Sequence, residues 1–153
     1  MTAAIRIVDL SFSYPSPLPD EPPAPALRQI NLEIEVGQIV ALVGPVGAGK
    51  TTLCLSLNGI VPQLTGGQFS GEVLVDGLST ADHPVARIAR HVGIVFENAE
   101  VQLFNASVED EVAFGLEEMG WAPAAIEKRI DWALDAVGLQ GARRRSPRTL
   151  SGG

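Results

Sequence analysis

The 153-residue chain has one cysteine, few aromatic residues and no long apolar run. The single cysteine, Cys54, excludes an internal disulfide and fits a reducing compartment, where we expect it to be a small buried apolar residue. The apolar stretches fall far short of the roughly 20 residues that a membrane-spanning helix needs. No charged-then-apolar leader opens the chain, so we expect no secretory signal. These features predict a cytoplasmic protein, and they still allow docking on a membrane protein.

Basic residues are also scarce. The chain has 11 Lys and Arg against 18 Asp and Glu, a net charge of −7, which argues against a nucleic-acid partner because phosphate contacts require positive side chains. The run Arg143-Arg144-Arg145 is a local exception, and three basic residues more often form a solvated turn than a binding patch. The length and the 46% apolar content fit one soluble globular domain.

Alternating and continuous apolar patterns predict the strands. Residues 5–12 read as a strand, residues 30–36 alternate as a half-buried antiparallel strand, and residues 71–77 form a short strand closed by an Asp-Gly turn. Residues 39–43 and 92–96 are apolar at every position, which is typical of strands covered on both faces. Between the first two strands, helix and ladder alike are excluded by Pro15, Pro17, Pro19, Pro22, Pro23 and Pro25.

Three helices are predicted. One runs from Lys50 to about Ile60, and a second opens at Ser107 in a capping-box pattern with Asp110. Its apolar stripe is Val108, Val112, Leu116 and Met119. The third ends at Gly138. Its expected inward residues are Ile126, Ile130, Ala133, Leu134 and Val137.

A phosphate-binding loop is the most informative motif, spelled Gly44-Pro45-Val46-Gly47-Ala48-Gly49-Lys50-Thr51. Glycines allow the backbone to wrap an anion, and the first turn of the following helix offers free N–H groups and a positive dipole end. Lys50 is expected to reach the β- and γ-phosphates, and the Thr51 hydroxyl to bind Mg²⁺. The alternative is a glycine-rich turn that matches by chance. The apolar strand before it and the helix after it favour a nucleotide site.

Five segments in order carry a family resemblance: 10–15, 27–34, 92–98 with 102–104, 107–115, and Leu150-Ser151-Gly152-Gly153. The chain resembles the ATP-binding subunits of ABC transporters, in particular those of the energy-coupling-factor branch, which powers uptake of vitamins and transition-metal ions. The resemblance implies an α/β fold: a P-loop NTPase core with an antiparallel β subdomain and an α-helical subdomain, truncated before the second acidic (Walker B) strand. It implies one incomplete domain, with a nucleotide-binding part over 1–96 and a helical part over 97–153.

The same resemblance implies a site shared between two subunits. Tyr14 would stack on adenine, and the signature residues Ser151, Gly152 and Gly153, after Leu150, would contact the γ-phosphate held by a second ATPase subunit or domain. The implied cofactors are ATP and Mg²⁺, and a transmembrane coupling subunit would hold the protein at the inner face of the cell membrane. The implied ATP-binding residues are Tyr14, Gly44, Pro45, Val46, Gly47, Ala48, Gly49, Lys50, Thr51 and Thr52.

Two departures from the family pattern affect catalysis. Glu97 stands where the family has a glutamine that helps hold Mg²⁺, so it is either a charged metal ligand or an exposed loop acid. The family's general base and switch histidine follow the signature, and this sequence ends at Gly153. His83 and His91 precede the signature and are expected to be ordinary surface residues. Two apolar strands make a marginal sheet, so we also expect an exposed apolar edge and aggregation of the isolated chain.

The leading hypothesis is therefore an ATP-binding subunit of an energy-coupling-factor importer, an ATP hydrolase by family, whose present portion binds nucleotide without completing hydrolysis. The alternative is a truncated, non-catalytic nucleotide-binding or interaction module. A small-molecule kinase with a phosphate loop is disfavoured, because the signature has no place there. The transported substrate is not readable from this sequence.

Overall fold

The computed structural model describes residues 3–16, 18 and 20–151. The chain divides into two compact units, Met1–Ile94 and Val95–Gly153. Each unit has its own buried core and is described separately below.

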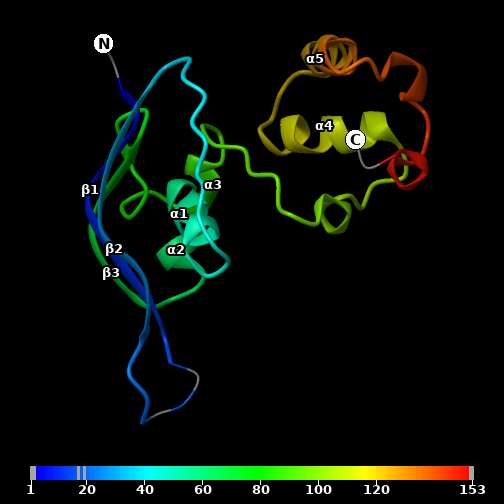
Figure 1. The fold of residues 1–153 in the computed structure, drawn as a ribbon. Helices are drawn as coiled ribbons and strands as arrows, with labels where there is room; N and C mark the ends of the chain where they lie inside the picture. The colour runs from blue at the N-terminus through cyan, green and yellow to red at the C-terminus, as the bar shows by residue number, and fades with distance from the viewer. Residues whose placement is uncertain (1–2, 17, 19, 152–153) are drawn as a thin grey trace. The chain divides into compact units, whose positions relative to one another are not determined.

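The first unit contains a four-stranded antiparallel sheet in the order β2-β1-β3-β4 (Figure 1). Its strands are β1 (Ala3–Tyr14), β2 (Ala24–Glu35), β3 (Gln68–Val75) and β4 (Leu78–Ser79). The strands predicted at 5–12, 30–36 and 71–77 are therefore confirmed, as is the antiparallel pairing predicted for 30–36. The expectation for Pro25 was wrong: it lies in β2, opposite Ser13. Proline is tolerated there because β2 is at the edge of the sheet, where a missing N–H costs no ladder bond.

Three short helices accompany this sheet: α1 (Lys50–Leu57), α2 (Ile60–Gln63) and α3 (Val85–Ile88). The predicted helix over 50–60 ends early because Gly59 has a φ of 78° and starts a separate turn. The core joins α1 to β1, β2 and β3 and consists of Ile7, Leu10, Phe12, Leu27, Leu53, Val61 and Val73. Cys54 is exposed, contrary to our expectation, because α1 turns Thr52, Leu53 and Ser56 inward and leaves Cys54 outside.

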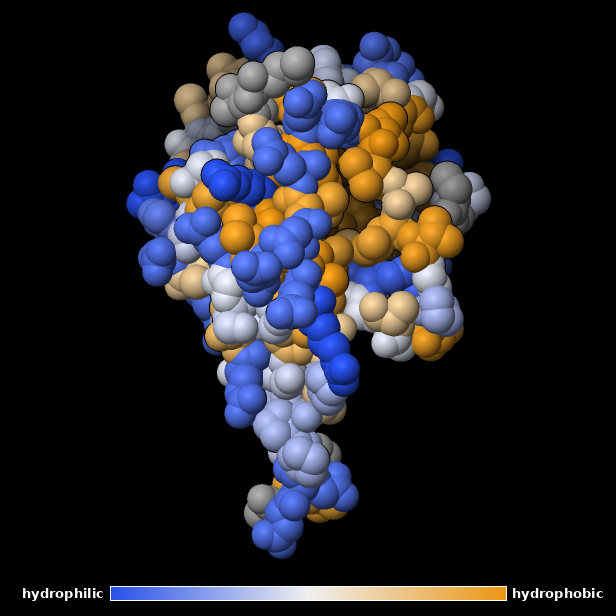
Figure 2. All heavy atoms as spheres, turned by 60° about the vertical axis from the view of Figure 1, so that its left-hand side comes forward, coloured by the Kyte–Doolittle hydropathy of each residue, from blue (hydrophilic) through white to orange (hydrophobic). Residues whose placement is uncertain are grey.

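The two segments that are apolar at every position form no strand in the described part of the chain, which corrects the prediction for 39–43 and 92–96. Ile39 is 100% exposed, Val43 89% and Val95 83%. Apolar side chains are accordingly visible at the surface in Figure 2 (orange). A strand of this kind is stabilised by parallel neighbours and covering layers. Among the described residues, no strand pairs with either segment.

The second unit is helical, with α4 (Val108–Glu118) and α5 (Pro123–Ala136) as its main elements (Figure 1). Short 3-10 helices span Ala99–Gln102, Gln140–Ala142 and Pro147–Thr149. Ser107 caps α4 as predicted: its hydroxyl oxygen accepts from the amide of Asp110 at 3.2 Å. The core consists of Val108, Ala113, Ile126, Ile130 and Leu134.

Two residues predicted on the inner faces of these helices lie further out. Val137 is 66% exposed, because α5 ends at Ala136 and Gly138 then turns the chain with a φ of 69°. Met119 caps the end of α4 and is 37% exposed. No helix in the described part of the chain is both long and apolar enough to cross a membrane.

Candidate nucleotide-binding site

The backbone of the phosphate loop has the shape that its glycines predict. Gly47 and Gly49 have φ values of 82° and 87°, in the left-handed region that side chains disfavour. A Cβ at Gly49 would lie 2.4 Å from the carbonyl oxygen of Ala26 and 3.0 Å from Cδ2 of Leu27 in β2. Glycine is therefore required at this position for two reasons: the backbone angle and the close approach of β2.

Lys50 points back over this loop. Its Nζ donates to the carbonyl oxygens of Gly44 and Pro45, both at 2.8 Å. Among the described residues, the amide N–H groups of Gly47 and Gly49 have no acceptor. The first N–H groups of α1 are free by the geometry of any helix start, and they carry a partial positive charge. The loop therefore combines free amide donors with a fixed ammonium group, which suits a polyphosphate.

The two threonines that follow Lys50 have different environments. Thr51 is exposed, and its hydroxyl makes no hydrogen bond within the described residues, so it is available as an oxygen ligand for a magnesium ion bound with nucleotide. Thr52 is 6% exposed, and its hydroxyl lies 3.1 Å from the hydroxyl of Tyr14. The Tyr14 ring also packs edge-to-face on Phe12, with ring centroids 4.8 Å apart. Tyr14 is thus attached to the helix that follows the phosphate loop, a contact that sequence spacing did not reveal.

Glu97 lies in the second unit, on an exposed bend between Phe96 and the 3-10 helix Ala99–Gln102. The side-chain oxygen of Gln102 accepts from the Phe96 amide at 3.0 Å, which closes this bend. Within the described residues, no group of three or more His, Cys, Asp or Glu side chains could hold a metal ion. Glu97 therefore belongs to no such group among the described residues, and its role stays a prediction.

The signature segment is described up to Ser151, whereas Gly152 and Gly153 lie outside the described residues. Leu150 packs against the core of the second unit and Ser151 is exposed. The Nδ1 atoms of His83 and His91 lie within hydrogen-bond distance of the Ser79 carbonyl and the Asp76 carboxylate, and the His83 carbonyl accepts from Gln63 Nε2 at 2.7 Å.

The arginine run lies in a turn, as predicted, and Arg144 and Arg145 are exposed. Arg143 differs from them: its guanidinium pairs with Glu109, Glu127 and Asp131. Glu127 and Asp131 are four residues apart on one helix, so they share a face. That spacing was the available signal, but nothing in the sequence indicated which cation they face.

Comparisons with known proteins agree with this geometry. The ABC transporter family model matches residues 27–153. Energy-coupling factor transporter ATP-binding proteins of Methanosarcina acetivorans and Methanothermobacter thermautotrophicus are 43% and 42% identical over 151 residues, covering 97% of this chain and 51% and 45% of theirs.

Among solved structures, cbiO1 of Clostridium perfringens, described as part of the ABC transporter complex cbiONQ, is 30% identical. It superposes with a TM-score of 0.80 over 99% of this chain and 57% of its own. The chain spans between 22% and 51% of the length of the curated relatives that it matches.

The predicted P-loop NTPase fold of the ABC type, with its antiparallel sheet and its helices, is thereby confirmed. The phosphate loop, the fold and the match over 27–153 together place this chain in the ABC transporter family, among its ATP-binding proteins, with homologues in the energy-coupling-factor branch.

Proposed function

We propose that this chain is the nucleotide-binding portion of an importer ATPase of the energy-coupling-factor type, which couples ATP binding and hydrolysis to uptake of a vitamin or metal ion. The observation that carries the proposal is the phosphate loop, in which Lys50 is held by the Gly44 and Pro45 carbonyls while the Gly47 and Gly49 amides have no acceptor among the described residues. The identity of 42–43% with energy-coupling factor ATP-binding proteins supports the transporter branch.

In this proposal, different residues of the first unit bind different parts of the nucleotide. The amides between Gly44 and Thr51 hold the phosphates, Lys50 exchanges its two carbonyl acceptors for phosphate oxygens, and the exposed Thr51 hydroxyl binds Mg²⁺. Mg²⁺ would neutralise charge on the β- and γ-phosphates during transfer to water. Tyr14, anchored through Thr52, takes the adenine ring.

The residues of the second unit would act between subunits. Ser151, with Gly152 and Gly153, would contact the γ-phosphate of a second ATPase subunit or domain, and Glu97 would lie near the metal in the closed dimer. A transmembrane coupling subunit would hold the assembly at the cytoplasmic face of the membrane. The description of cbiO1 as part of a transporter complex supports such partners.

Nucleotide binding is tested with Lys50→Ala, using Lys128→Ala on α5 as the matched control because these are the chain's only lysines. Lys50→Ala removes charge-assisted bonds worth about 1.5–3 kcal/mol each, so affinity should fall by about a hundredfold. Titration calorimetry with Mg-ATP measures both variants. Equal affinities in the two would refute the phosphate site.

Hydrolysis is a separate measurement. Phosphate release by the full-length polypeptide with its partner subunits distinguishes a transport ATPase from a non-catalytic binding module. The proposal requires turnover that stops in Lys50→Ala. Tight ATP binding without turnover in the assembled complex would favour the binding module instead.

A further inference from the structure

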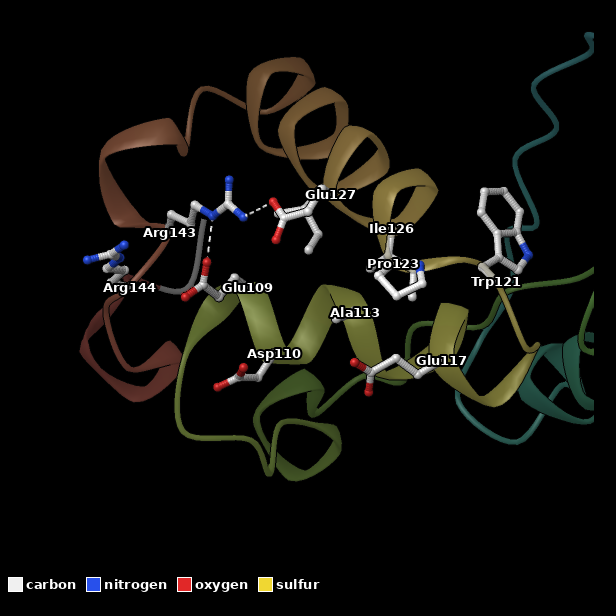
Figure 3. Close-up of a pocket in the computed structure, with 11 residues that line it drawn as sticks. Glu109, Asp110, Ala113, Glu117, Trp121, Pro123, Ile126, Glu127, Arg143 and Arg144 are labelled. Carbon is white, nitrogen blue, oxygen red and sulfur yellow. Dashed lines mark hydrogen bonds and ion pairs between the residues drawn. The ribbon is translucent and has the colours of Figure 1, made fainter.

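Arg143 is the most heavily bonded side chain in the second unit. Its Nε donates to Glu109 of α4 at 2.5 Å, while its Nη2 and Nη1 donate to Glu127 and Asp131 of α5 at 2.5 and 2.7 Å. Figure 3 shows the bonds from Arg143 to Glu109 and Glu127 at one end of the groove between α4 and α5, with Trp121 at the other end. One side chain thus joins both helices of the unit.

The three bonds use all three nitrogens of the guanidinium, each with a different carboxylate. Only 28% of the side chain is exposed, although Glu127 and Asp131 are mostly exposed. Hydrogen bonds to Glu127 and Glu109 raise the pKa of Arg143 above its ordinary value. Lysine could not replace it, because an ammonium group lacks the planar fork that reaches several acceptors at once.

The backbone of the same segment is also bonded to α4. The carbonyl oxygens of Arg143 and Arg145 accept from the amides of Glu109 and Val108, both at 3.0 Å. These two amides belong to the first turn of α4, where no partner exists within the helix. The segment that begins at Arg143 is therefore held at one point by side chain and main chain together.

Local bonds continue from this point to the signature. Nη2 of Arg145 donates to the Thr149 carbonyl at 2.6 Å, and the Thr149 and Leu150 amides donate to Ser146 and Pro147. Leu150 then packs against the core of the unit. The next residue is Ser151, so the bonded segment ends directly at the first signature residue that would meet nucleotide.

We infer that Arg143 is the positioning residue of the signature segment. By clamping residues 143–150 to α4 and α5, it presents Ser151 in a single orientation to the nucleotide on a second ATPase domain. The inference rests on the proposed function for the role of Ser151 in the dimer, whereas the clamp itself does not. A prearranged Ser151 avoids an ordering cost when the dimer closes, and small misplacements of a reacting group can cost about a hundredfold in rate.

The first test measures the clamp without requiring activity. A nitroxide label at Ser151→Cys, in full-length protein carrying Cys54→Ser, reports local mobility by electron paramagnetic resonance. Arg143→Met should convert an immobilised spectrum into a mobile one, and Arg143→Lys should be intermediate. Arg144→Met is the matched control, because Arg144 makes no hydrogen bond or ion pair among the described residues. Identical label mobility in Arg143→Met and the parent would overturn the inference.

The second test uses unlabelled full-length protein with its partners. Arg143→Met should lower the kcat for ATP hydrolysis about tenfold or more, while the Kd for ATP at the phosphate loop and the melting temperature stay near those of Arg144→Met. A kcat within twofold of the parent overturns the inference, as does a loss of kcat that follows a matching loss of ATP affinity. If the parent itself neither hydrolyses ATP nor dimerises with it, the proposed function fails, while the labelling result still decides the clamp.

Discussion

Gly47 and Gly49 adopt similar left-handed backbones in the phosphate loop, but their surroundings differ. A Cβ at Gly47 would meet nothing within 4 Å, whereas one at Gly49 would strike the Ala26 carbonyl. Gly47→Ala should cost only the backbone penalty of about 1–2 kcal/mol. Gly49→Ala should cost that penalty plus overpacking of about 1–3 kcal/mol. Urea unfolding midpoints of the two variants measure the difference.

The two glycine variants serve as controls for each other, since the residue change and the loop are the same. If both lose equal stability, the contact between Gly49 and β2 is not a constraint on the fold. At the scale of single residues, the phosphate loop thus packs closely against β2 through Gly49, in addition to having a backbone conformation suited to binding an anion.

In helix α5, the burial of an apolar residue depends on whether it lies within the helix or beyond its end. Leu134 is 3% exposed and belongs to the core of the second unit, whereas Val137 is 66% exposed beyond the end of the helix. Leu134→Ala should therefore destabilise by about 2–5 kcal/mol. Val137→Ala should change stability by no more than about 0.5 kcal/mol. Thermal and urea unfolding distinguish them, and a large loss in Val137→Ala would mean that the inner face extends past Ala136, where α5 ends.

The whole molecule leaves its most apolar segments uncovered. Within the described residues, neither 39–43 nor 92–96 has a ladder partner, while β1 pairs on both sides with β2 and β3. Hydrogen exchange of the 153-residue polypeptide should therefore be fast in 39–43 and slow in β1. The polypeptide should also bind a hydrophobic dye and aggregate with increasing concentration.

The matching control is the longer protein, because the curated relatives are about two to four times as long as this chain. In it, segment 39–43 should become protected if further strands cover it. Slow exchange of 39–43 in the 153-residue polypeptide would contradict the exposed state described here.

Local patterns predicted those parts of the fold whose partners are close in sequence or strongly periodic. Alternation over 30–36 identified β2, and the Ser107 capping box identified the start of α4, because each depends on neighbouring residues. Apolar periodicity gave wrong predictions of burial where burial depends on residues that are distant in the sequence. Cys54 and Val137 look like core residues in sequence, yet the face that α1 turns inward and the end of α5 leave both exposed.

The sequence alone determined the nucleotide class, since the phosphate loop and its flanking segments need only local order to be recognised, and it determined family membership through the order of its motifs. The tertiary structure decided which charges meet. Arg143 finds Glu109, Glu127 and Asp131 only when α4 and α5 pack side by side. Ion pairs between residues up to 34 positions apart depend on that packing, and no local pattern encodes it.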